Sequence, residues 1–92
     1  MRIETNSGKT LDADWLLDTT TRNGVQQLVI QLPGETPTAD IFALIGADTI
    51  EAVKENGVKT VYEGYTLFSS FICASDRSTV RLTLEKGAAD HD

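Results

Sequence analysis

The sequence predicts a mainly β protein (α+β): a small antiparallel β-barrel or sandwich of six to seven strands with one short helix. Most of the chain alternates apolar and polar residues with a period of two, which is the pattern of half-buried strands. Asparagine–glycine pairs interrupt the alternation at Asn23-Gly24 and Asn56-Gly57, and such pairs favour hairpin turns. Helical spacing of apolar residues occurs in one segment, Pro37 to Ile45.

The N-terminal third predicts three strands in meander order. Met1 to Thr5 alternates and is followed by a turn at "NSG". Alternation from Lys9 to Asp18 predicts a single half-buried strand. Its expected inward residues are Leu11, Ala13, Trp15 and Leu17. Asn23-Gly24 suits a type I′ turn, because both residues accept a positive φ. The strand after it places Leu28, Ile30 and Leu32 on one face.

The helix is expected after the Pro33-Gly34 turn. Its start signals are a capping residue, a proline at the first helical position and an acid in the first turn: Thr36, Pro37 and Asp40. Its apolar residues are Ile41, Leu44 and Ile45, and Gly46 supplies a left-handed stop. So short a helix is unstable alone, so we expect it to dock at an open end of the sheet.

Asp48 to Thr66 predicts a second hairpin around Asn56-Gly57. A two-residue turn would place Lys54 opposite Lys59, a mildly unfavourable pair, whereas a three-residue turn with a bulge avoids it. Both registers stay open. The closing strand, "STVRLTLEK", is expected to point Val80, Leu82 and Leu84 inward. Residues 1–86 are predicted to form one domain, and residues 87–92 a flexible polar tail.

The stretch from Val61 to Ser75 is too long for one straight strand. Fifteen extended residues would span about 50 Å, whereas a chain of this length has a radius of gyration near 12 Å. The expected inner residues change from odd to even positions along it: Val61, Tyr65 and Leu67, then Phe68, Ile72 and Ala74, with Phe71 and Cys73 opposite. Gly64 and Ser69-Ser70 are the positions where the strand can bend. We expect a bent strand that serves two sheets.

The predicted core consists of Leu11, Trp15, Leu28, Ile30, Ile41, Leu44, Leu82 and Leu84. Cys73 alternates with apolar residues, which is typical of a buried packing thiol, and a single cysteine excludes an internal disulfide.

Charge and chemistry narrow the function classes. The net charge is −6 and the basic residues are scattered singly, so neither nucleic acid nor an anionic membrane surface is an expected partner. The chain has no apolar run that predicts a membrane span or a signal peptide. The lone histidine, His91, lies near the end of the chain, and no catalytic set, metal or cofactor is predicted.

Two groups of carboxylates offer alternative interpretations, one as a metal site and one as a catalytic pair. Asp12, Asp14 and Asp18 share a predicted strand face and would form a weak divalent-cation site, but a solvated outer face is the favoured interpretation. Glu51, Glu55 and Glu63 would supply a carboxylate pair for acid–base chemistry, which nothing nearby supports.

The leading hypothesis is therefore a structural or interaction module that self-associates or docks through a strand edge. The closing strand lacks proline, and its outer residues are predicted to form the interaction edge: Thr79, Arg81, Thr83 and Glu85. A peptide-binding β-domain is the second hypothesis and a carboxylate enzyme the third. A small-molecule substrate is not expected, because so small a domain needs its inner faces for its own core.

The segments "MRIETNSGKTLDADW", "EGYTLFSS" and "STVRLTLEK", with a short helix after a Pro-Gly turn, resemble small prophage-encoded proteins of Gram-positive gut bacteria, often found among head and tail genes. The resemblance covers nearly the whole chain and transfers no catalytic residue. It implies a non-enzymatic virion or assembly component that contacts copies of itself or other phage structural proteins. Such a component would be located in the bacterial cytoplasm during assembly, with the virion as a further location. The acidic tail "GAADHD" departs from the pattern.

Overall fold

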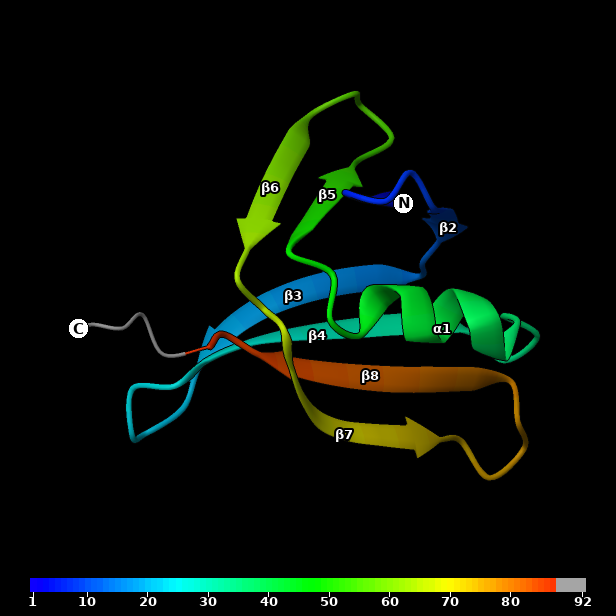
Figure 1. Cartoon of the computed structure of the whole chain (residues 1–92). Coiled ribbons are helices and arrows are strands. Elements are labelled where there is room, and N and C mark those ends of the chain that lie inside the picture. Colours follow the sequence, from blue (N-terminus) through cyan, green and yellow to red (C-terminus); the bar gives the residue numbers. More distant parts are fainter. Residues whose placement is uncertain (88–92) are drawn as a thin grey trace.

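The computed structural model describes residues 1–87 of the 92-residue chain, and it is a sandwich of two four-stranded antiparallel sheets with one helix (Figure 1). The first sheet has the order β2 (Thr10–Asp12), β1 (Arg2–Thr5), β5 (Thr49–Val53), β6 (Lys59–Glu63). The second has the order β3 (Trp15–Thr20), β4 (Gln26–Pro33), β8 (Thr79–Glu85), β7 (Leu67–Cys73). The mainly β class with one short helix is confirmed. The sandwich is the architecture that fits, because the barrel does not close, and the described strands number eight.

The chain passes directly from one sheet to the other between β2 and β3. The Ala13 amide donates to the carbonyl of Met1 at 2.8 Å, whereas the next amide, Asp14, donates to Gln31 in the second sheet at 2.8 Å. The predicted single strand from Lys9 to Asp18 is therefore two strands. The crossing changes which residues face inward, so the inward placement of Trp15 and Leu17 is wrong.

The stretch from Val61 to Ser75 does split between the two sheets, as predicted. It forms β6 in the first sheet and β7 in the second, and Gly64, with a φ of 84°, lies in the break between them. A second irregularity lies at Ser69, where the pairing of β7 with β8 shifts between Phe68 and Ser70. Both predicted bending positions are confirmed.

The residues of this stretch that face inward differ from the prediction. Antiparallel partners share a face, and the partners of Phe68, Phe71 and Cys73 are the buried residues Leu84, Leu82 and Val80. Phe71 and Cys73 thus lie on the inner side, whereas Ile72 pairs with Arg81 on the outer face. The bulge at Ser69 causes the change, because one extra residue reverses the alternation.

Burial corrects four further expectations in this stretch. Tyr65 is buried, as predicted, but Val61 and Leu67 are half exposed. Cys73 is exposed rather than a packed core thiol, because β7 is an edge strand whose inner side is not fully covered. Ala74 is only partly buried, in the turn that leads to β8.

The turns at the two asparagine–glycine pairs have the same construction. Thr21 donates to Val25 at 2.9 Å, and Gly24 donates to Thr21 at 3.0 Å, which gives a three-residue turn. Gly24 has a positive φ and Asn23 does not, so the predicted type I′ turn is wrong. The other turn is also of the three-residue kind, since the amide of Lys54 donates to Val58 at 2.9 Å. This is the register that keeps Lys54 from facing Lys59.

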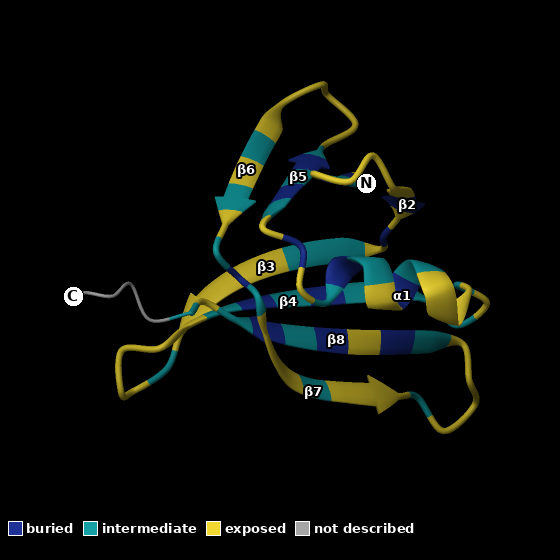
Figure 2. Cartoon of the chain, in the orientation of Figure 1, coloured by how far each residue is buried: buried dark blue, intermediate teal, exposed yellow. Residues whose placement is uncertain are grey.

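The core lies between the sheets, and seven of the eight predicted core residues are buried in it: Leu11, Leu28, Ile30, Ile41, Leu44, Leu82 and Leu84 (Figure 2). Trp15 is the exception. It lies half-buried on the outer face of the second sheet, where the guanidinium carbon of Arg81 is 5.3 Å from the centre of its ring.

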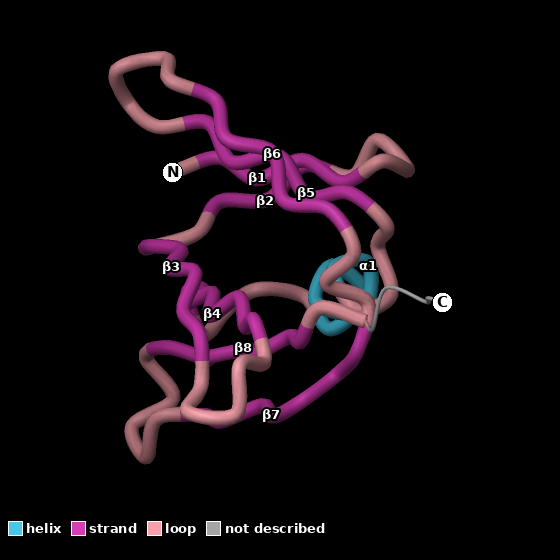
Figure 3. The backbone as a smooth tube through the Cα atoms, turned by 90° about the vertical axis from the view of Figure 1, so that its left-hand side faces the viewer, coloured by secondary structure: helices cyan, strands magenta, loops and turns pink. Residues whose placement is uncertain are grey.

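Helix α1 (Thr38–Leu44) lies between the sheets at one end of the sandwich (Figure 3). Ile41 and Leu44 face the core, and the carboxylate of Asp40 forms a 2.6 Å ion pair with Lys9 of the β1–β2 turn. Thr36 does not cap the helix, because its hydroxyl donates to the carbonyl of Pro33 and Pro37 takes the N-cap position. In the described part of the chain, no helix is long and apolar enough to cross a membrane.

The predicted tail begins at a residue that the structure ties to the domain. The amide of Gly87 donates to the carbonyl of Gly64 at 2.8 Å. The rest of that prediction, residues 88–92 with His91, lies outside the described residues.

Candidate protein-docking surface

The sandwich has four edge strands, and three of them carry features that discourage pairing with another chain. Natural edge strands avoid such pairing by being short or by carrying charged residues. Strand β2 has three residues and ends in Asp12. Strand β3 carries Asp18 opposite the buried Leu28, which places this charge on the inner side. Strand β6 begins with Lys59 and ends with Glu63.

Strand β7 has none of these protecting features. It is seven residues long, contains no charged residue and no proline, and pairs only with β8. Its other side therefore presents unpaired backbone donors and acceptors to solvent. The sequence signal for this edge is the uncharged run "LFSSFIC", which belongs to the stretch predicted to form a bent strand that serves two sheets.

The closing strand β8, in contrast, is not an edge. It lies between β4 and β7 and pairs with both, so the prediction that it offers an interaction edge is wrong. The four residues concerned lie in this doubly paired strand: Thr79, Arg81, Thr83 and Glu85. Two of these side chains form hydrogen bonds with β4: Arg81 donates to the Gln31 side chain at 3.3 Å, and Glu85 accepts from the Gln27 side chain at 3.0 Å.

Exposed apolar side chains gather on β7 and on the neighbouring helix. Figure 2 shows β7 exposed over nearly its whole length. The exposed fractions are 50% for Leu67, 54% for Phe68, 39% for Phe71, 59% for Ile72 and 64% for Phe42 of α1. We call these five residues the β7 patch. Phe68 and Phe71 lie on the inner side of β7 and line a groove with Phe42, whereas Leu67 and Ile72 lie on the outer face of the same strand. Apolar side chains exposed together in this way typically mark interaction sites.

A groove separates β7 from α1. Its volume is about 210 Å³, and its lining is almost entirely apolar: Thr38, Ile41, Phe42, Ile45, Phe68 and Phe71. The bulge at Ser69 builds this groove, because it brings Phe68 and Phe71 to the same side of the strand. Cavities for drug-sized ligands usually measure about 300–1,000 Å³, so the groove suits an apolar side chain better than a whole small molecule.

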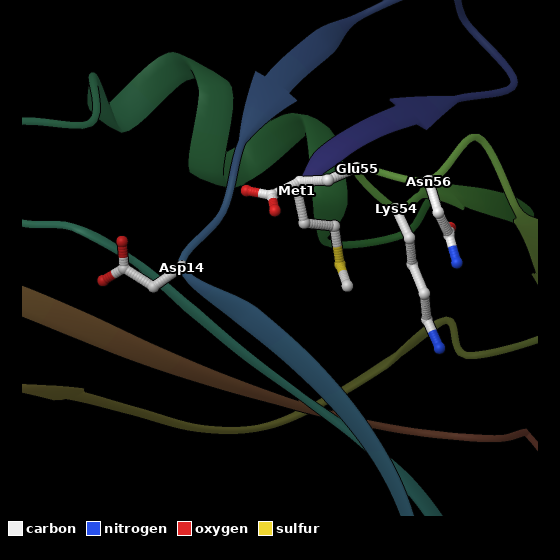
Figure 4. A pocket seen from close by; sticks show the side chains of 5 residues that line it. All are labelled: Met1, Asp14, Lys54, Glu55 and Asn56. Atoms are coloured by element: carbon white, nitrogen blue, oxygen red, sulfur yellow. The ribbon is translucent and has the colours of Figure 1, made fainter.

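The hollow in Figure 4 has a different character. It measures about 450 Å³, is wide open to solvent and is lined by Met1, Asp14, Lys54, Glu55 and Asn56. Met1 lies between Asp14 on one side and the residues of the β5–β6 turn on the other (Figure 4). Its α-amino group donates to the carbonyl of Ala13 at 3.1 Å. These polar groups do not converge on one point, as the groups of a ligand site do.

The acidic residues of the two carboxylate alternatives are distributed over several strands and turns. Within residues 1–87, no three or more histidine, cysteine or acidic side chains are grouped so that they could hold a metal ion. Asp14 lies at the crossing between the sheets, and Asp18 lies on the inner side of β3. Glu51 and Glu63 lie on the paired strands β5 and β6, opposite Val61 and Thr49 respectively, whereas Glu55 lies in the β5–β6 turn.

Two tyrosines lie close together near the end of β6, Tyr62 within the strand and Tyr65 in the crossing to β7. The rings of Tyr62 and Tyr65 meet edge to face with their centres 6.1 Å apart, and the ammonium of Lys86 is 5.7 Å from the centre of the Tyr65 ring. Burial, and after it the negative charge of Asp18, raise the pKa of both phenols above the ordinary value.

This arrangement predicts a loss of stability in alkali. Because the pKa values are higher in the folded chain, the neutral phenols contribute stability below the pKa of unfolded tyrosine, and that contribution is lost as the pH rises through the folded values. Titration followed by the ultraviolet absorbance of tyrosinate is expected to show higher midpoints in the folded protein than in denaturant. Asp18→Asn should lower the folded midpoints. Equal midpoints in the folded and denatured chains would contradict the expectation.

Comparisons of the chain with protein-family models, curated proteins and solved structures give no match. The β7 patch is therefore identified by its geometry alone: an unprotected strand edge beside an apolar groove. Docking through a strand edge stays a prediction, and the strand predicted to supply that edge, β8, is an inner strand.

Proposed function

We propose that this protein is a non-enzymatic structural or assembly component that acts through protein–protein contacts made by the β7 patch. The observation that carries the proposal is the coincidence of an uncharged, unprotected edge strand with an adjoining apolar groove. The resemblance to prophage head and tail proteins supplies the setting. The partners are then copies of the chain or other phage structural proteins, met in the bacterial cytoplasm during assembly, with the virion as a further location.

Binding by strand addition follows from this geometry. A partner strand adds to β7 through backbone hydrogen bonds, and its alternate side chains point to the inner side of the sheet. There they meet Phe68, Phe71 and the groove beside Phe42 of α1. The backbone supplies affinity and the groove selects for an apolar side chain.

A peptide-binding β-domain of the bacterial cell is the second candidate function. The groove beside the edge favours it, because a strand edge next to a pocket for a side chain is how domains of that kind hold extended peptides. The surface is the same in both cases, and the partner distinguishes them.

The proposal is tested by introducing a lysine into β7 and, as a control, into the edge strand β6. Leu67 and Val61 are both 50% exposed and lie opposite Glu85 and Glu51 respectively, so a lysine at either position meets an acid across the sheet. Tagged wild-type, Leu67→Lys and Val61→Lys chains are used to capture proteins from a host lysate in which the neighbouring genes are expressed. We expect the wild type and Val61→Lys to retain the same partner, and Leu67→Lys to lose it.

Two results would contradict the proposal. One is a partner that all three chains retain equally, which would place the contact elsewhere. The other is a wild-type chain that retains nothing, copies of itself included.

A further inference from the structure

We infer that the strand which adds to β7 is β7 of a second copy, so that two chains form a two-fold symmetric dimer with one continuous eight-stranded sheet. This inference rests on the proposed function, because it names the partner of the same surface. A two-fold axis pairs identical strands in antiparallel order, and both copies contribute the same residues.

Strand β7 itself has the properties that its free edge and the adjoining groove require of a partner strand. The free edge and the groove call for an extended segment without charge whose apolar side chains are exposed. Among the described strands, β7 is the exposed edge that meets this description, since β2, β3 and β6 each carry a charged residue. The surface is thus complementary to itself.

The distribution of charge points to the same partner. With a net charge of −6, two copies repel each other wherever their acidic surfaces meet. An antiparallel β7 pair instead sets uncharged residues opposite uncharged residues over the whole strand, so it avoids like charges across the new ladder. A basic partner would gain most by contacting acidic side chains, and β7 contains none.

The two aromatic residues of the inner side also fit this pairing. Neighbouring antiparallel strands lie about 4.8 Å apart and opposed residues share a face. The inner sides of the two copies therefore become continuous, and Phe68 and Phe71 of one copy lie beside those of the other. Aromatic rings pair favourably with their centres about 4.5–7 Å apart. The groove next to Phe42 then opens onto the aromatic residues of the second copy.

The exposed apolar area of the β7 patch sets an upper limit on the apolar surface that a dimer buries there. From their exposed fractions and usual size, the five residues of the β7 patch offer an area on the order of 500 Å². Complete coverage of the patch in both copies would bury about 1,000 Å² of apolar surface, which is the lower end of the size of specific interfaces. Backbone pairing along β7 adds to this area.

Sedimentation equilibrium over a range of concentrations tests the inference. The wild type is expected to be a dimer, and Leu67→Lys to raise the dissociation constant at least about tenfold, because a lysine on an edge strand disfavours the addition of a further strand. Val61→Lys, on the β6 edge, should leave the constant unchanged. Ile72→Asp is a second charged variant whose new acid lies opposite Arg81, which keeps the β7–β8 pair compatible with the fold. Circular dichroism verifies that each variant is folded.

Cross-linking tests the symmetry of the pair. In a Cys73→Ser background, Ser69, Ser70, Phe71 and Ile72 are replaced one at a time by cysteine, and Val61→Cys serves as the control. A two-fold antiparallel pair places one residue of β7 opposite itself, so disulfide-linked dimers should peak at one position and decline on both sides. The control should form few.

The outcomes separate this inference from the proposed function. A wild type that stays monomeric to millimolar concentration overturns the inference, as does a dimer that Leu67→Lys does not weaken or one that cross-links only through Val61→Cys. If the chain is monomeric but loses a captured partner on Leu67→Lys, the inference fails and the proposed function stands.

Discussion

Leu82→Ala is expected to lower the free energy of unfolding by about 2–5 kcal/mol. Leu82 lies in β8, an inner strand of its sheet, and its side chain is completely buried. It pairs with Ile30 on one side and Phe71 on the other. Because both neighbours are held in ladders, the core cannot collapse into the space that the leucine leaves, and the resulting cavity adds to the lost hydrophobic burial.

Chemical denaturation followed by circular dichroism measures the loss. Leu17→Ala is the matched control, since Leu17 is 55% exposed on the outer face of β3, and its change should stay within about 0.5 kcal/mol. An unchanged dependence on denaturant would show that only stability differs between the chains. A loss below about 0.5 kcal/mol for Leu82→Ala would contradict the assignment of the inner face.

Gly34→Ala is expected to cost about 1–3 kcal/mol through a steric clash. Gly34 follows β4 and donates to the carbonyl of Ser78 at 3.0 Å. A Cβ there would overlap the carbonyl oxygen of Arg77 and lie 2.9 Å from its carbonyl carbon. The clash is with backbone, so a side chain cannot move aside to relieve it.

The turn that contains Arg77 is itself constrained. The amide and the hydroxyl of Ser78 both donate hydrogen bonds to the carboxylate of Asp76, at 3.0 and 2.7 Å. The hydrogen bond from the amide, and after it the one from the hydroxyl, lowers the pKa of Asp76. Arg77 already adopts a φ of 62°, which is uncommon for a non-glycine residue. A shift of the turn would disturb both features.

Gly87→Ala is the control for this prediction. Its added Cβ would make only ordinary contact, 3.5 Å from the Thr66 hydroxyl, so the change in unfolding free energy should stay within about 0.5 kcal/mol. Equal losses for Gly34→Ala and Gly87→Ala would contradict the steric explanation.

Local patterns determined the fold class, the helix and the places where the chain turns. Period-two alternation predicted strands, and the spacing of Ile41 and Leu44 predicted the helix. Asn56-Gly57 predicted a hairpin, because turn geometry depends on the conformational freedom of a few adjacent residues. The bend within Val61 to Ser75 also followed from local information, since a straight strand of that length would not fit the domain.

The tertiary structure decided the order of strands, and with it the candidate docking surface. Neither the crossing after Ala13 nor the insertion of β8 between β4 and β7 leaves a local mark, because strand order is set by contacts between distant residues. Trp15 was assigned to the core for that reason, and β8 to an edge. The exposure of the β7 patch likewise follows from what the first sheet and α1 leave uncovered, so the uncharged run "LFSSFIC" marks a free edge only once its neighbours are known.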